Sequence, residues 1–320
     1  SHGGGTEEGQ REVLAGYGIT EERLGVPVVT TVDTVYLGNC ANGRPVWFDR
    51  AAYEADLIVP INRVKLHTDF VGPIQSGLCK MLVIGLGNHK GCSAVHEEAP
   101  EVFADAIEET ARLILQKAPV GFGIAILENA YDKTYAVEAV PAEHLVEREK
   151  ELVQIAKGNM PYIMLDEADV IVCGAIGKDI SGAGFDPNIL GRSSVLKQFV
   201  LHIPRYQRLV LCDVTPASHG NGIGVGLFDV ITKKVAEQLD LESMYANAIA
   251  CNCLGDASVP CTVDDEETAI RVALKCCRNI DRDHPRIIRI QNTLHLGEIE
   301  VSEALLDAVR ADSRMSLIEN

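Results

Sequence analysis

The stretch Asp169-Val170-Ile171-Val172-Cys173 is a short apolar run that opens into a glycine-rich segment, Gly177 to Asn188. A continuous run of this length, rich in β-branched residues, is typical of a strand buried on both faces of a parallel sheet. A second such strand, Leu209 to Asp213, again leads into a glycine-rich loop, Ser218 to Gly226. This repeated pattern predicts an α/β fold with a mostly parallel sheet.

Length and composition limit the possible classes of protein. The chain has 320 residues, 47% of them hydrophobic and 23% charged, with a net charge of −17. This length predicts two α/β domains, 1–157 and 158–320, with a hinge near Gly158 and an active-site cleft between them. The acidic balance argues against nucleic acid or a membrane surface as a partner. Without a long apolar run or a signal peptide, we expect a soluble, cytoplasmic protein.

The first half carries further element signals. The chain opens on a helix with no strand before it, which predicts that the domain's first strand lies outside the numbered sequence. Predicted strands and helices of the chain follow in order: a strand at 28–32, a hairpin of 35–37 with 45–48, a buried strand at 56–61, a helix after Pro100, strands at 121–127 and 134–139, a helix at 142–157, and a helix carrying Phe228, Ile231, Val235 and Leu239.

The connection after the 56–61 strand is the candidate site. It is long, and it carries more titratable groups than a simple connection needs, namely Lys65, His67, Lys80, His89, Lys90 and His96. Open α/β sheets bind their ligands beyond the carboxyl ends of their strands. Cations in an acidic protein would attract an anion such as a carboxylate or phosphate. Glycines in this connection, including Gly72 and Gly77, would let the backbone approach a bound group.

Two other patterns are weaker. The glycines of Gly222-x-Gly224-x-Gly226 do not have the G-x-G-x-x-G spacing of a dinucleotide site and start well beyond the strand end. The ten cysteines include the pairs 251/253 and 276/277, but neither pair has the C-x₂-C spacing of a zinc site. We interpret them as structural thiols, with Cys277 on the core face of a helix.

The first hundred residues resemble the nickel-pincer lactate racemase family, whose members racemise or epimerise 2-hydroxy acids; the second half resembles it only in outline. Four motifs carry the resemblance: His2-Gly3-Gly4-Gly5-Thr6-Glu7-Glu8, Leu37-Gly38-Asn39 with Gly43-Arg44-Pro45-Val46, His67 with Phe70-Val71-Gly72, and Ser76-Gly77-Leu78-Cys79-Lys80 with His96 sixteen residues later.

The resemblance implies a cofactor and roles for these residues. The family's cofactor is a nickel pincer nucleotide, pyridinium-3-thioamide-5-thiocarboxylic acid mononucleotide with Ni(II), made by dedicated cofactor-synthesis enzymes. Lys80 would tether it through a thioamide, and His96 would supply the fourth nickel ligand, since imidazole suits Ni(II). His2 and His67 would be the two catalytic bases, one for each face of the substrate. Cofactor contacts are expected at Gly72, Ser76 and Gly77.

The substrate-binding residues are predicted separately from these motifs. The family's substrate-binding Gln and Lys of the second domain are not evident, and the loop from His67 to Lys80 is longer than usual. We therefore expect Lys178 or Arg192 to bind the carboxylate of a small 2-hydroxy acid. Three alternatives stay open: a non-catalytic protein that binds an anion or metal, a nicotinamide-dependent dehydrogenase, and a cysteine-ligated iron–sulfur protein.

Overall fold

The computed structural model describes residues 5–318, which fold as two compact units. The first unit extends to Asn129 and includes Lys133–Asn159; the second comprises Ala130–Asp132 and the chain from Met160 onward. Sheets and helices alternate along the chain, and most strand pairs are parallel, so the predicted α/β class is confirmed. The predicted cleft between the domains stays a prediction.

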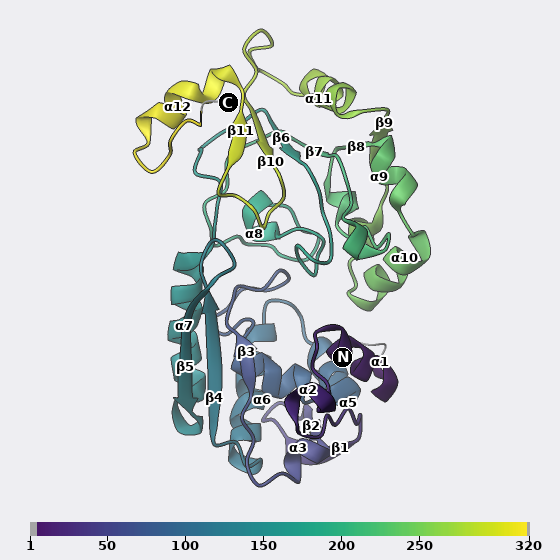
Figure 1. Cartoon of the computed structure of the whole chain (residues 1–320), viewed down its shortest axis with the longest axis vertical. Coiled ribbons are helices and arrows are strands. Elements are labelled where there is room, and N and C mark those ends of the chain that lie inside the picture. The colour runs from purple at the N-terminus through teal and green to yellow at the C-terminus, as the bar shows by residue number, and fades with distance from the viewer. Residues whose placement is uncertain (1–4, 319–320) are drawn as a thin grey trace. The chain divides into compact units, whose positions relative to one another are not determined.

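The first unit runs from purple to teal in Figure 1. Its helices are α1 (Glu7–Gly16), α2 (Glu21–Leu24), α3 (Arg50–Tyr53), α4 (Leu78–Lys80), α5 (Asn88–His96), α6 (Phe103–Lys117) and α7 (Leu145–Asn159). Its strands are β1 (Thr34–Asn39), β2 (Pro45–Asp49), β3 (Ile61–Arg63), β4 (Phe122–Glu128) and β5 (Thr134–Pro141). A π-helical turn, Met81–Gly85, follows α4, and a 3₁₀ turn, Ala142–His144, precedes α7.

A three-stranded sheet in the order β3-β4-β5 supports the first unit. Strand β3 is parallel to β4, and β5 is antiparallel to it. Alternation along β4 places Gly123, Ala125 and Leu127 in the interior. Helices α4 and α7 pack on this face, because a Cβ at Gly123 would lie 2.6 Å from Leu78 and 3.3 Å from Leu145. The sheet therefore fixes the position of α4, which carries Lys80.

The predicted hairpin of β1 and β2 is confirmed, and its tip is fixed by a buried arginine. Arg44 pairs with Glu98 at 2.5 Å and with Glu109 of α6 at 2.8 Å, and it also donates to the carbonyl of Ala106. Its side chain is only 5% exposed. Removing one partner of a buried ion pair typically costs about 3–5 kcal/mol. Arg44 therefore fastens the hairpin to α6.

Two strand predictions in this unit are wrong. Residues 28–32 pair with no strand, and Val29 is 64% exposed. In the 56–61 run, Ile58 makes only a single bridge to Val120, and regular pairing begins at Ile61. Strand β3 lies at the sheet edge with Ile61 54% exposed, so it is not the buried strand that the apolar run indicated. The predicted elements that became α6, β4, β5 and α7 are confirmed.

The second unit contains strands β6 (Val170–Cys173), β7 (Arg208–Leu211), β8 (Val230–Thr232), β9 (Cys261–Val263), β10 (Ile287–Ile290) and β11 (Ile299–Val301). Its helices are α8 (Pro187–Leu190), α9 (Lys233–Gln238), α10 (Leu241–Ala250), α11 (Glu266–Lys275) and α12 (Leu306–Ala311). The strands form one sheet in the order β11-β10-β6-β7-β8-β9. Only β11 runs antiparallel to its neighbour within this sheet.

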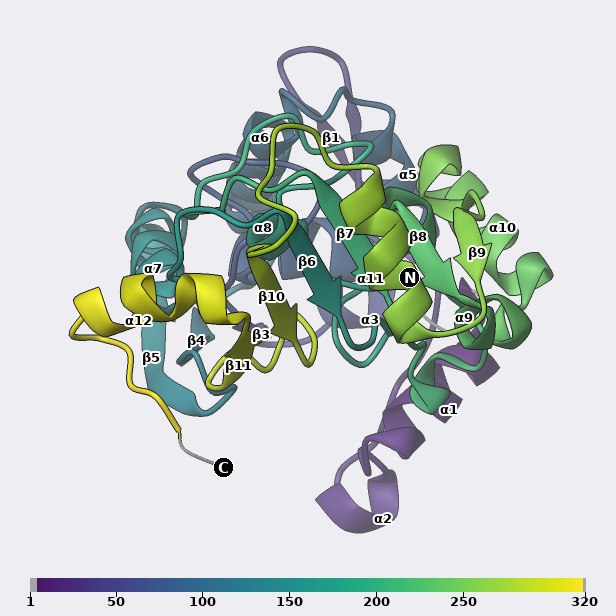
Figure 2. The same ribbon diagram turned by 90° about the horizontal axis from the view of Figure 1, so that it is seen from above.

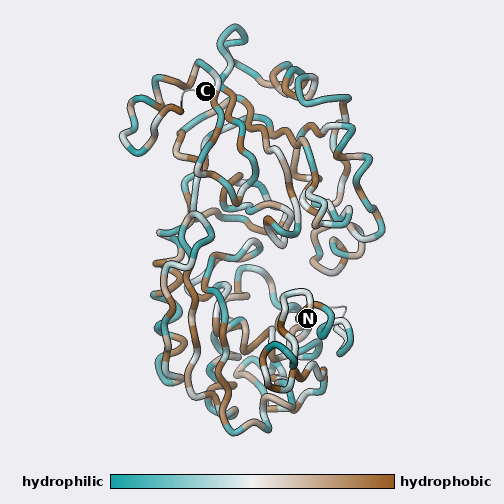
Figure 3. The backbone as a smooth tube through the Cα atoms, viewed as in Figure 1, coloured by the Kyte–Doolittle hydropathy of each residue, from teal (hydrophilic) through white to brown (hydrophobic). Residues whose placement is uncertain are grey.

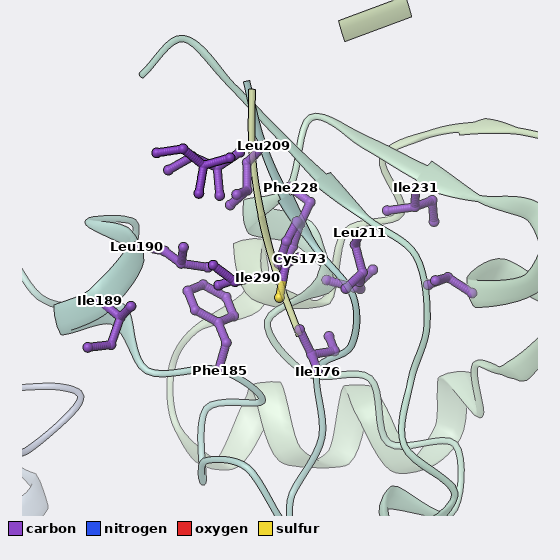
Figure 4. Close-up of a cluster of buried hydrophobic side chains, with 14 of the residues drawn as sticks. Cys173, Ile176, Phe185, Ile189, Leu190, Leu209, Leu211, Phe228, Ile231 and Ile290 are labelled. Carbon is purple, nitrogen blue, oxygen red and sulfur yellow. The ribbon is translucent and has the colours of Figure 1, made fainter. Parts of the chain in front are cut away.

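Both faces of this sheet are covered. Val170 and Val172 of β6 face α11, which lies across the strands in Figure 2. Ile171 and Cys173 face the opposite side and join a larger cluster, part of which Figure 4 shows. The hydropathy tracing in Figure 3 is brown along these strands, as expected for a sheet covered on both sides.

The helix predicted across Phe228 to Leu239 is wrong in its first half. Residues Val230–Thr232 form β8, and α9 begins only after Thr232, whose hydroxyl accepts from the Val235 N–H. Neighbouring strands β7 and β9 provide pairing partners, which outweigh the helical spacing of the apolar residues. The glycine loop therefore leads into a strand and not into the helix that a dinucleotide fingerprint requires.

No disulfide joins the ten cysteines, all of which lie within residues 5–318. Cys253 and Cys277 are buried as expected of structural thiols, whereas Cys251 and Cys276 are exposed. Within residues 5–318, no helix combines the length and the apolar character needed to cross a membrane.

Candidate functional site

The segment between β3 and α4 is a closed, packed loop. Its base is pinned by a pair of hydrogen bonds between Lys65 and Ser76: the Lys65 N–H donates to the Ser76 carbonyl at 2.9 Å, and the reverse bond measures 3.1 Å. Inside the loop, the buried Gln75 accepts from the His67 N–H at 2.7 Å and donates to the Gly72 carbonyl at 3.2 Å. These bonds hold the backbone at His67 in one position.

Lys80 is placed by an unusual helical turn. It ends α4, and the π-helical turn Met81–Gly85 follows without a break, closed by the Leu86 N–H donating to the Met81 carbonyl at 2.9 Å. Single π-helical turns are rare and are often found at functional sites. The preceding Leu78 and Cys79 are fully buried, so the turn that presents Lys80 is anchored in the core.

Lys80 and His67 are in direct contact. Lys80 Nζ lies 2.5 Å from His67 Nε2, and the Asp69 N–H donates to His67 Nδ1 at 3.0 Å. Since Nδ1 accepts this hydrogen bond, a neutral His67 carries its proton on Nε2. That N–H can donate to Lys80 only if the amine has a free lone pair. The geometry therefore fits a neutral lysine beside a neutral histidine.

The electrostatics agree with this assignment. Burial lowers the pKa of Lys80, and the charge of Lys65 adds to this effect, although Asp69 opposes it. Burial also lowers the pKa of His67 well below its usual 6.5, and the charges of Lys80, Lys65 and His96 lower it further. The His67 side chain is only 13% exposed. At neutral pH the site thus holds an unprotonated imidazole and an amine with increased nucleophilic character.

His96 lies in the last turn of α5 with its ring exposed. Its Nδ1–H donates to the Cys92 carbonyl at 2.7 Å, and the Cys92 thiol lies 3.4 Å from the same nitrogen. The hydrogen bond with Cys92 raises the pKa of His96. In the neutral ring Nδ1 carries the hydrogen and Nε2 has the lone pair, and a metal ligand held in this way has a fixed orientation.

Two phenylalanines link the histidines. The His67 ring stacks on Phe70 at 4.3 Å between centroids, Phe70 lies 4.9 Å from Phe103, and Phe103 lies 5.0 Å from His96. The charge of His96 lowers the pKa of His67, and the charge of Lys80 lowers that of His96. His67, Lys80 and His96 therefore belong to one local cluster of the first unit.

The glycines near Lys80 have a structural explanation. A Cβ on Gly72 would lie 2.2 Å from the Cβ of Ala104, and one on Gly77 would lie 2.5 Å from the carboxylate of Glu149. The protein's own packing requires glycine at both positions. At Gly72 and Gly77, the groups that approach the backbone closely are therefore side chains of helices α6 and α7.

The two predicted substrate-binding residues lie in the second unit and differ in their surroundings. Arg192 pairs with Asp229 at 2.6 Å, donates to the Leu227 carbonyl at 2.8 Å, and lies over the ring of Tyr206. A substrate carboxylate would have to displace Asp229. The ammonium of Lys178 donates to the carbonyl of Gly182 at 2.6 Å and to the side chain of Asn247.

Several other residues of the sequence prediction fall elsewhere. His2 lies outside the described residues. His89 is exposed, and Lys90 lies over the Trp47 ring at 4.8 Å rather than in the His67–Lys80 cluster. The sequence analysis missed three residues of the site, namely Gln75, Cys92 and Glu149. Only Cys92 had a usable signal, its spacing of four residues from His96 on a helix.

Comparison with known proteins gives matches among solved structures alone. Neither a family model nor a curated protein matches the chain. Among solved structures, the lactate racemase apoprotein from Thermoanaerobacterium thermosaccharolyticum matches 82% of this chain and 67% of its own at a TM-score of 0.43 and 13% identity. A protein from Thermotoga maritima matches 60% of this chain and 53% of its own, with a TM-score of 0.39 and 13% identity. These likenesses concern the fold and assign no activity.

The lowered pKa of Lys80 can be measured on the protein alone. We expect Lys80 to be acylated by acetic anhydride with a pH midpoint below the usual 10.5. Lys65→Ala should raise the Lys80 midpoint, because it removes a neighbouring positive charge. Peptide mass spectrometry gives both values. A Lys80 midpoint at or above 10.5 would contradict the lowered pKa.

Proposed function

We propose that this chain racemises or epimerises a 2-hydroxy acid by reversible hydride transfer, using a nickel pincer nucleotide tethered to Lys80. The observation that carries the proposal is the cluster of Lys80, His67 and His96. The Lys80 amine lies 2.5 Å from an imidazole that is unprotonated at neutral pH. In its neutral form His96 has a lone pair on Nε2, because its Nδ1–H donates to the Cys92 carbonyl. The sequence resemblance supplies the chemical identity of the group that would join them.

The donor set of the first unit fits this cofactor. Within the described residues, there is no group of three or more His, Cys, Asp or Glu side chains suited to holding a metal ion. A pincer nucleotide brings two sulfur donors and a ring carbon to nickel, so it requires of the protein one amine and one imidazole. Lys80 and His96 are those two groups, and imidazole is a suitable fourth donor for square-planar Ni(II). When bound, the cofactor supplies the hydride acceptor.

The remaining chemistry falls to the chain's own side chains. His67 would take the proton of the substrate hydroxyl and return it, which requires an unprotonated ring. Its lowered pKa meets that condition at neutral pH. His2 would be the base for the opposite face of the substrate. Lys65 and the other cations of the loop add positive charge that favours an anionic substrate.

Replacing His67 tests its role in proton transfer. We expect His67→Ala to lower kcat by roughly 10²–10⁴-fold while the fold is retained. The matched control is His89→Ala, an exposed histidine from the same stretch, which should leave kcat unchanged. The assay follows interconversion of 2-hydroxy acid enantiomers by protein made together with the cofactor-synthesis enzymes. Near-normal turnover by His67→Ala would remove His67 from the mechanism.

Two variants test whether Lys178 or Arg192 binds the carboxylate of the substrate. Lys178→Ala should raise KM about tenfold or more, because a charged hydrogen bond is typically worth ~1.5–3 kcal/mol. Arg192→Ala should mainly lower stability, since its guanidinium is already paired with Asp229. Steady-state kinetics and urea denaturation distinguish the two effects. If neither variant changes KM, neither residue binds the carboxylate.

A further inference from the structure

Glu149 is a carboxylate buried beneath the turn that carries Lys80. It lies in the middle of α7 and is 0% exposed. Its Oε2 accepts from the Cys79 N–H at 2.8 Å, and the Leu78 N–H also donates to the carboxylate. These are the first N–H groups of α4, which have no partner within their own helix. Glu149 therefore supplies from another helix the cap that α4 lacks.

Gly77 makes this arrangement possible. It precedes α4, provides no side-chain cap of its own, and leaves a space that Glu149 fills, since a Cβ there would lie 2.5 Å from Oε1. On the other side of the same residue, the Gly77 carbonyl accepts from the Asn62 side chain at 2.9 Å. The turn is thus held through its N–H groups by α7 and through its carbonyl by the segment of β3.

The carboxylate is maintained there without a neighbouring cation. Within the part of the chain that the structure describes, Glu149 has no ion pair, because its neighbours Arg148 and Lys150 pair with other carboxylates. Burial accordingly raises the pKa of Glu149 to about 7, against the opposing effect of the N–H groups that it accepts from. An apolar residue of similar volume would fill the same space but would leave the Cys79 N–H without its hydrogen-bond acceptor. Packing alone does not explain a glutamate here.

We propose that Glu149 is a positioning residue for Lys80, fixing the Gly77–Lys80 turn so that the amine meets His67. The proposal rests on the proposed role of Lys80 for its functional meaning, but not for its geometry. Lys80 directly follows Cys79, whose N–H is held at 2.8 Å, so loss of the carboxylate releases the backbone from which the amine projects. The side chain then leaves the buried position beside His67, where Lys65, Asp69, Cys92 and His96 also influence its charge or that of His67.

The test follows the pH midpoint of Lys80 acylation in the protein without cofactor or substrate. Glu149→Ala should raise the midpoint by about one unit, equivalent to a tenfold smaller neutral fraction at a given pH. Glu149→Gln keeps an oxygen that accepts from the Cys79 N–H, so its midpoint should stay at the wild-type value. The matched control is Glu151→Ala, an exposed glutamate of the same helix, which should have no effect.

A purely structural role predicts a different result. If Glu149→Ala folds by circular dichroism, loses thermal stability and keeps the wild-type Lys80 midpoint, the proposal is overturned. If that variant does not fold, Gly77→Ala decides, because its added methyl pushes against the carboxylate from the other side. A raised Lys80 midpoint in Gly77→Ala supports the proposal, and an unchanged one contradicts it.

The test of Glu149 and the test of the proposed function can fail independently of each other. A raised midpoint in Glu149→Ala together with no enantiomer interconversion by the loaded wild-type protein would leave the positioning role intact and remove the racemase. The reverse combination, normal interconversion with a midpoint that does not depend on Glu149, would remove only the positioning role.

Discussion

The contact between Lys80 and His67 is the interaction on which the candidate site depends. Two nitrogen atoms 2.5 Å apart in a largely buried position cannot both carry a positive charge without a large electrostatic penalty. Burial and the neighbouring cations move both pKa values downward, which favours loss of a proton from each group. An amine of lowered pKa beside an unprotonated base is suited to holding a carbonyl-derived group covalently and to moving a proton next to it.

The scaffold makes this contact by fixing backbone on both sides. Gln75 holds the main chain of His67 inside a loop that Lys65 and Ser76 close. Glu149 holds the turn before Lys80. The buried ion pairs of Arg44 fasten the hairpin to α6, the helix whose Phe103 contacts the ring of His96. Gln75 and Ser76 act within the loop itself, whereas Glu149 and the carboxylate partners of Arg44 come from distant parts of the sequence. Together these anchors determine where a short stretch of chain presents its reactive side chains.

Sequence patterns were sufficient where one face of an element is apolar and its ends are marked. The hairpin around Gly43, helix α6 and strand β6 were therefore predictable. The contact of Lys80 with His67 also falls within the stretch that the sequence singled out. Residues 28–32 and 230–232 were misassigned, because pairing partners, which the local sequence does not contain, decide whether an apolar run becomes a strand. Glu149 was missed for a similar reason, since a glutamate in a charged helix gives no signal of the glycine that it faces seventy-two residues earlier.

The central claim is that Lys80 and His96 serve one nickel-bearing group, and intact mass with nickel analysis tests it most directly. Protein made together with the cofactor-synthesis enzymes should carry a covalent adduct at Lys80 and about one nickel per chain. Lys80→Ala should lose the adduct, and His96→Ala should keep the adduct but lose nickel. An adduct that persists in Lys80→Ala, or nickel retained by His96→Ala at the wild-type level, would contradict the account.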